Sequence, residues 1–134
     1  MIRKVDYFAM QVQDHAGVAH KMLAQLRKAG VNLLAFTGFP SGRGSQMDFV
    51  PANSAAFRKA AKAAGWKVGK AKTGFLIQGS DRTGALDATL SKLARAKINV
   101  TAVDGVVAGG GRYGAILWVK SKDFAKASKT LKAR

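Results

Sequence analysis

The chain contains one stretch twice, and this internal repeat constrains its fold more than any other feature. Displacing the sequence by 67 residues (75 − 8) aligns Phe8 with Phe75 and continues without a gap to Lys67 and Arg134. The aligned part holds 17 identical residues in 60 pairs. A repeat of this length indicates two copies of one supersecondary unit. We therefore predict two tandem units, residues 1–70 and residues 71–134.

Each copy carries the same polar motif, an Asp followed three residues later by Gly and then by a distant Asn. The first copy reads Asp14-His15-Ala16-Gly17 and continues to Asn32, and the second reads Asp81-Arg82-Thr83-Gly84 and continues to Asn99. In both copies the Asn lies 15 residues after the Gly (32 − 17 and 99 − 84). An Asp before an apolar-periodic segment can accept hydrogen bonds from the first free amides of a helix. Asp14 and Asp81 are thus predicted to be helix N-caps.

Hydrophobic periodicity predicts the same order of elements in both copies. Strands are expected at residues 6–13, 31–39, 46–50, 66–68, 72–78, 98–107 and 113–119, and helices at residues 18–29, 57–64, 86–93 and 124–131. The order strand-helix-strand-strand-helix-strand closes most simply as an antiparallel sheet with the helices on one face. The predicted fold class is therefore α+β, with two tandem ferredoxin-like βαββαβ units.

The second copy ends with its second helix, so it is predicted to lack a fourth strand. That strand would lie beside the strand at residues 72–78, whose backbone groups would otherwise be left unpaired. An uncovered apolar edge promotes aggregation, so something is expected to cover it. Residues 1–5, residues 66–69 and the same strand of another chain are the candidates. We expect another chain, because pairing about a two-fold axis gives a closed homodimer.

The Asp-x-x-Gly motif, the helix after it and the Asn at the next strand resemble the ACT domain. This family consists of βαββαβ ligand-binding modules that regulate amino-acid metabolism, and the resemblance covers nearly the whole chain in tandem. It implies a non-catalytic regulatory protein that binds an amino acid at an interface between ACT units, within one chain or across a homodimer. The ligand-binding residues it implies are Asp14, His15, Ala16, Gly17, Val18 and Asn32 in the first copy, and Asp81, Arg82, Thr83, Gly84, Ala85 and Asn99 in the second.

The chemistry of these residues suits an amino acid, although each also has a purely structural interpretation. Free amides at a helix N-terminus favour a carboxylate, and a neighbouring Asp can accept from an ammonium group. An Asn side chain both donates and accepts hydrogen bonds. The structural alternatives are a helix cap for the Asp, a turn for the Gly, and a helix-strand turn for the Asn.

The charge defines the main functional alternative. The chain has 23 Lys and Arg against 7 acidic residues, all of them Asp, for a net charge of +16. Such a balance attracts polyanions non-specifically, so a basic nucleic-acid-binding protein on the same topology is the second interpretation. A scaffold whose units only mediate oligomerisation is the third.

Other function classes find no support in the sequence. It has no nucleophile beside a base, no carboxylate pair and no cofactor motif, so we expect neither catalysis nor a cofactor. His15 and His20 have no Cys, Glu or third His to complete a metal site. No apolar run reaches the length of a membrane span, and the N-terminus does not resemble a signal peptide. A cytoplasmic location is expected.

Overall fold

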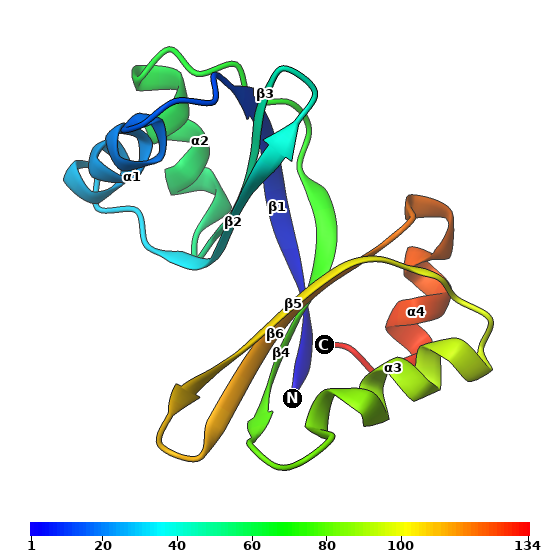
Figure 1. Cartoon of the computed structure of the whole chain (residues 1–134). Coiled ribbons are helices and arrows are strands. Elements are labelled where there is room, and N and C mark those ends of the chain that lie inside the picture. The colour runs from blue at the N-terminus through cyan, green and yellow to red at the C-terminus, as the bar shows by residue number, and fades with distance from the viewer. The chain divides into compact units, whose positions relative to one another are not determined.

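The computed structural model describes all 134 residues, from Met1 to Arg134, with six strands, four α-helices and one 3₁₀ turn. The chain forms two compact units. The first comprises Asp6–Lys72, and the second comprises Met1–Val5 together with Thr73–Arg134. Within each unit, two helices lie against a small antiparallel sheet (Figure 1). The sequence places a boundary between residues 70 and 71, whereas in the structure the first five residues lie with the second unit.

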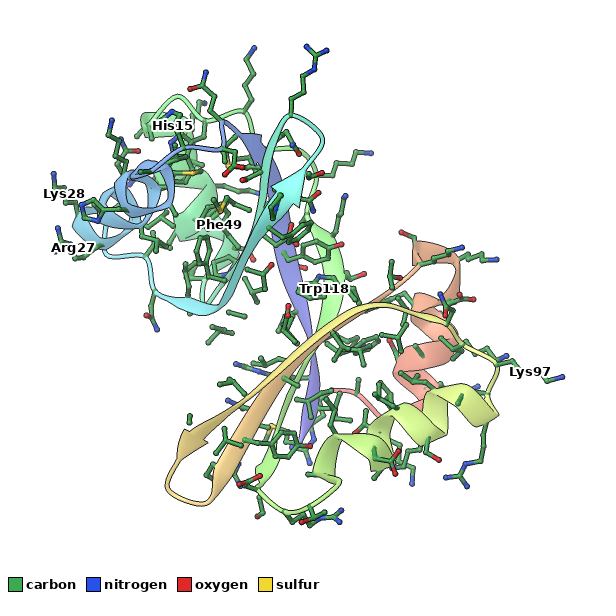
Figure 2. All side chains as sticks on the ribbon, viewed as in Figure 1. His15, Arg27, Lys28, Phe49, Lys97 and Trp118 are labelled. Carbon is green, nitrogen blue, oxygen red and sulfur yellow. The ribbon has the colours of Figure 1, made fainter.

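The first unit follows the predicted order of elements. Its elements are β1 (Ile2–Val12), α1 (Val18–Lys28), β2 (Leu33–Ser41), β3 (Gly44–Pro51) and α2 (Ser54–Ala63). β3 pairs antiparallel with both β1 and β2, so the strand order is β2-β3-β1. The core contains Phe8, Phe49 (labelled in Figure 2) and Phe57, and all three are without solvent exposure. The rings of Phe8 and Phe57 stack with their centroids 4.8 Å apart.

The predicted short strand at residues 66–68 is wrong, because this segment has no regular secondary structure. It follows Gly65 (φ 74°), which lies just after the C-terminal end of α2. The Trp66 amide donates to the Ala61 carbonyl at 2.9 Å. Trp66 and Val68 pack against the core instead, with the Trp66 ring 5.9 Å from that of Phe49. Side-chain burial, and not a hydrogen-bond ladder, therefore holds this segment.

The second unit repeats the order of the first. Its elements are β4 (Lys72–Ser80), α3 (Ala85–Arg95), β5 (Val100–Gly109), β6 (Arg112–Val119), a 3₁₀ turn (Ser121–Asp123) and α4 (Phe124–Thr130). Phe75 and Phe124 stack at 4.9 Å between centroids, and they are the repeat counterparts of Phe8 and Phe57. The sequence-based prediction of two ferredoxin-like units is confirmed. None of the four α-helices has the length and apolar character needed to cross a membrane.

The N-terminus of the chain covers the edge of β4. Met1 and Gln78 exchange both backbone hydrogen bonds, at 2.9 Å from the Gln78 amide and 2.6 Å from the Met1 amino group. This reciprocal pair is the pattern of antiparallel strands. The prediction that another chain covers this edge is wrong, whereas the predicted need for cover is confirmed. Residues 1–5 take the place of the missing fourth strand, and Arg134 pairs with them through Ile2 and Lys4.

The two repeats are not in register along their whole length. Val12 lies opposite Ser45 in the first unit, whereas Gly79 lies opposite Tyr113 in the second. The separations are 33 residues (45 − 12) and 34 residues (113 − 79), so β3 and β6 correspond at an offset of 68 and not 67. The extra residue sits where the β5–β6 register shifts between Val107 and Gly109. The alignment without a gap is wrong over these two strands because of this bulge.

Candidate functional site

Helices α1 and α3 begin at glycines in the left-handed region. Gly17 (φ 92°) and Gly84 (φ 74°) occupy the N-cap positions, and neither helix has a side-chain cap. The predicted capping by Asp14 and Asp81 is therefore wrong. A side chain at a positive φ is strained, which accounts for the Gly in both copies. Because no side chain caps these helices, amides of the first turn remain available to another acceptor.

A cavity of about 440 Å³ lies beside this helix start in the second unit. It occupies the helix-bearing side of the sheet, between the loop before α3, the second half of β5 and Tyr113. Its lining residues are Asp81, Arg82, Gly84, Ala85, Leu86, Asp87, Val103, Gly105, Val106, Val107 and Tyr113. Four of the predicted site residues thus line one cavity. Thr83, in the same loop, is exposed and does not line it.

The loop of the second unit is tied to the β5–β6 hairpin. The Asp81 amide donates to the Gly111 carbonyl at 2.8 Å, and the Ala85 amide donates to the Arg82 carbonyl at 3.1 Å. Both bonds join backbone groups and do not involve the side chains of Asp81 and Arg82. These two residues, which carry opposite charges, line the cavity. The polar end of the cavity can therefore bind both an ammonium group and a carboxylate.

The sequence alone did not identify the apolar walls of this cavity. Tyr113 lies over Gly79, where an added Cβ would come within 2.9 Å of its Cε1 atom. Leu86 faces Gly105, where an added Cβ would lie 3.4 Å from Cδ2. A Gly inside a strand often marks the close approach of another group. Gly79 and Gly105 are therefore the positions in the sequence that could have pointed to these walls.

The equivalent loop of the first unit is exposed, as residues 81–84 of the second unit are. Asp14, His15, Ala16 and Gly17 are all open to solvent, and Val18 begins α1 and packs on the core. The His15 ring is held within its own loop, with Nε2 3.0 Å from the Gln13 side-chain oxygen and Nδ1 3.3 Å from the Ala16 carbonyl oxygen. His15 thus orders this loop locally.

The two Asn residues lie away from the loops of their own units. Asn32 lines a separate cavity of about 400 Å³ near the end of α1, with Leu23, Arg27 and Leu33 among its walls. Asn99 is exposed at the start of β5. An 11-residue helix separates loop and Asn in each unit, about 16 Å along its axis. One site that contains both would need the loop of one unit and the Asn of another.

A buried polar cluster lies on the sheet of the first unit. Asp48, only 6% exposed, accepts from the Thr37 hydroxyl at 3.3 Å and from the Gln46 amide at 3.0 Å. Burial raises the pKa of Tyr7, and the nearby Asp48 carboxylate raises it further. Both effects disfavour the phenolate form of Tyr7.

The basic side chains point outward. Arg27 and Lys28 project from the end of α1, and Lys97 projects from the turn after α3 (Figure 2). One cavity of about 400 Å³ is lined by Arg58, Lys62 and Trp66 at the end of α2. The Arg58 guanidinium also lies 4.8 Å from the centroid of the Phe8 ring.

Comparison with known proteins identifies the fold. No protein-family model and no curated protein matches the sequence. Among solved structures, protein BT0572 from Bacteroides thetaiotaomicron matches with a TM-score of 0.78 at 17% identity, over 98% of this chain and 88% of that one. The regulatory subunit of aspartate kinase from Thermus thermophilus, in its ligand-free form, gives 0.63 at 14% identity, over 98% and 93%. The corresponding subunit from Thermus flavus gives 0.59 at 14%, over 98% and 92%.

These likenesses agree with the architecture described above. The chain has the fold of a tandem ACT protein, with two ferredoxin-like units. The resemblance inferred from the repeated Asp-x-x-Gly motif is confirmed at the level of the fold.

Proposed function

We propose that the protein is a non-catalytic, cytoplasmic regulatory module that binds an α-amino acid in its second unit. The observation that carries this proposal is the cavity of about 440 Å³, which brings the Asp81–Ala85 loop together with the apolar walls of β5 and Tyr113. The volume lies within the range of small-molecule sites, which combine apolar walls with a few polar groups. The similarity to regulatory subunits of aspartate kinase supports a regulatory role.

The polar end of the cavity fits the main-chain groups of an amino acid. The ligand carboxylate binds at the uncapped start of α3, where the helix dipole and the Arg82 guanidinium both favour an anion. Its ammonium group binds the carboxylate of Asp81 or Asp87. The side chain then extends toward β5. In this arrangement Gly84 allows close approach because it has no Cβ.

We further propose that the site lies at an interface between ACT units and that the Asn residues complete it. Asn32 and Asn99 do not approach the loop of their own unit, so a second unit must supply the amide. The exposed edge of β5 offers the place for a homodimer. Val106 there is 68% exposed and Val107 is 56% exposed, on a strand that contains no Lys, Arg or Pro.

A ligand screen followed by paired variants tests the proposal. Thermal shift against the twenty amino acids identifies a ligand, which at ~100 times its Kd adds about 2.7 kcal/mol of stability. Asp81→Asn should weaken binding by about 1–3 kcal/mol in calorimetry, because a charged hydrogen bond is lost. Asp123→Asn, at the start of α4, is the matched control and should leave the affinity unchanged. Absence of any amino-acid ligand would contradict the proposal.

Nucleic-acid binding is the second candidate, and the net charge of +16 is the observation that favours it. Such binding should be non-specific and should weaken steeply from about 50 to about 200 mM salt, because it depends on counterion release. Fluorescence anisotropy with single-stranded and double-stranded oligonucleotides measures this dependence. Sequence-selective binding that survives physiological salt would favour this function over the regulatory one.

A further inference from the structure

The two repeats differ in one cross-strand pair next to their ligand loops. In the first unit Val12 lies opposite Ser45, and in the second Gly79 lies opposite Tyr113. The larger residue of the pair is thus on β1 in the first unit (Val12) and on β6 in the second (Tyr113). Because the loop follows the first strand, this exchange places an aromatic ring from β6 beside the Asp81 loop.

Gly79 creates the space that Tyr113 occupies. A Cβ at position 79 would lie 2.9 Å from the Tyr113 Cε1 atom and 3.6 Å from its Cζ atom. A contact under 3.0 Å forces something to shift, so any larger residue at position 79 would displace the ring. Tyr113 is half-buried and lines both the cavity of about 440 Å³ and a neighbouring one of about 210 Å³. Tyr113 thus contributes to the lining of both cavities, together with Arg82 and Ala85.

The rest of the compartment beside Tyr113 is apolar. Val107 pairs with Tyr113 across the strands, and Val103 lies on the same face of β5. Leu86 closes the compartment from α3, against the small floor of Gly105. The charged groups of the cavity lie on the loop and at the start of α3, away from this compartment. A ligand bound with its main-chain groups at the loop would meet apolar side chains and the Tyr113 ring beyond them, with the Tyr113 hydroxyl as a polar group there.

We propose that Tyr113, seated over Gly79, selects an α-amino acid with an apolar side chain, and that the second unit alone takes this ligand. This proposal rests on the function proposed above and adds the ligand class and the unit. A charged or strongly polar side chain finds no partner among these groups and gains nothing from covering them, so it binds more weakly. An aliphatic or aromatic side chain gains from burial against Val103, Val107 and the ring.

Calorimetry with L-leucine, L-phenylalanine, L-aspartate and L-lysine tests the selection. Wild-type protein should bind L-leucine or L-phenylalanine at one site per chain, at least tenfold tighter than L-aspartate and L-lysine. Gly79→Ala should weaken the preferred ligand at least tenfold. Gly114→Ala is the control on β6, because a Cβ there meets only the Ile77 carbonyl oxygen at 3.7 Å. It should change the affinity less than threefold.

Two more variants keep the test independent of folding. Tyr113→Ser introduces the residue that the first unit has at this place, and Tyr113→Phe keeps the ring. Serine should abolish the preference for apolar ligands, and phenylalanine should retain it, with thermal melts showing that both proteins fold.

The possible failures are distinguishable. Binding of an amino acid that is unaffected by Gly79→Ala and Tyr113→Ser, that favours L-aspartate or L-lysine, or that occurs at two sites per chain would overturn this inference alone. Absence of binding for every amino acid would overturn the proposed function as well.

Discussion

A residue with left-handed backbone follows each of the four α-helices. The two units use different residue types at this position. Gly30 and Gly65 end the helices of the first unit, with φ of 73° and 74°. Lys97 (φ 59°) and Lys132 (φ 52°) hold the matching positions in the second. The next amide reaches back to the last turn each time, as Ile98 does to the Leu93 carbonyl at 2.9 Å. The second unit thus forms the same helix ends with strained residues.

Lys97→Gly should therefore stabilise the protein. A residue with a Cβ pays roughly 1–2 kcal/mol in the left-handed region, partly offset by the greater freedom of Gly in the unfolded chain. We expect the free energy of unfolding to rise by up to about 1 kcal/mol, measured by urea titration. Lys92→Gly, inside α3, is the control and should lower it by about 1 kcal/mol. A loss of stability in Lys97→Gly would show that the Lys side chain contributes more than its backbone strain costs.

The sequence pointed to a loop that lines a cavity, but not to how the backbone of that loop is built. Asp81 and Gly84 stood out because the motif occurs twice. Asp81 was predicted to be the N-cap residue, but Gly84 occupies that position in the structure. The spacing along the chain does not reveal whether the side chain of a residue three places before the N-cap can still reach the first amides of the helix. Tyr113 was missed as a site residue because its role depends on a cross-strand partner, Gly79, and on a register that the sequence does not show.

At the element scale, regular periodicity gave most of the fold. Every predicted helix and six of the seven predicted strands are present, because alternating or helical apolar spacing follows directly from which face is buried. The failures have local causes. Residues 66–68 bury side chains without a ladder partner, and the bulge before Gly109 shifts β6 by one residue. Neither event changes the pattern of apolar residues, so neither leaves a signal in it.

The pairing of residues 1–5 with β4 makes a further prediction. A variant that begins at Asp6, behind an initiator Met, loses the burial of Ile2 against the core and several backbone hydrogen bonds. The free energy of unfolding should fall by about 2 kcal/mol or more, and the Gln78 amide should exchange rapidly with deuterium. Lys4→Ala keeps the backbone and should stay within about 0.5 kcal/mol of wild type. Unchanged protection at Gln78 would show that this edge needs no cover.

At the scale of the whole molecule, the charge is distributed unevenly over the strands. The chain carries 23 basic residues, yet β2, β3 and β5 have none, and β5 presents Val103, Val106 and Val107 to solvent. Proteins protect edge strands with Lys, Pro or bulges, and apart from register irregularities near its two ends β5 has only Asp104. We therefore expect another strand to cover this edge. Because positive charge elsewhere repels a second copy, a strand without basic residues is where two copies can approach.

We predict a homodimer in which β5 of one copy pairs with β5 of the other. In an antiparallel pair centred on Gly105, Val103 of one copy lies opposite the partner's Val107, and both face the helices. The same register sets the partner's Thr101 opposite Gly109, so the partner's Asn99 lies near the β5–β6 turn that contains Gly111, whose carbonyl accepts from the Asp81 amide. The dimer would thus bring an Asn to the ligand loop, which no single unit achieves. A closed two-fold pair of this kind leaves no β5 edge exposed.

Light scattering combined with calorimetry tests the dimer. Wild-type protein should have twice the mass of one chain, and the proposed ligand should shift the equilibrium further toward the dimer, since binding and assembly are linked. Val106→Lys places a charge on the edge and should give a monomer with weakened ligand binding. Ala125→Lys adds the same charge on the exposed surface of α4 and should remain dimeric. A wild-type monomer that binds an amino acid with full affinity, unaffected by Asn99→Ala, would show that each chain completes its site without a partner.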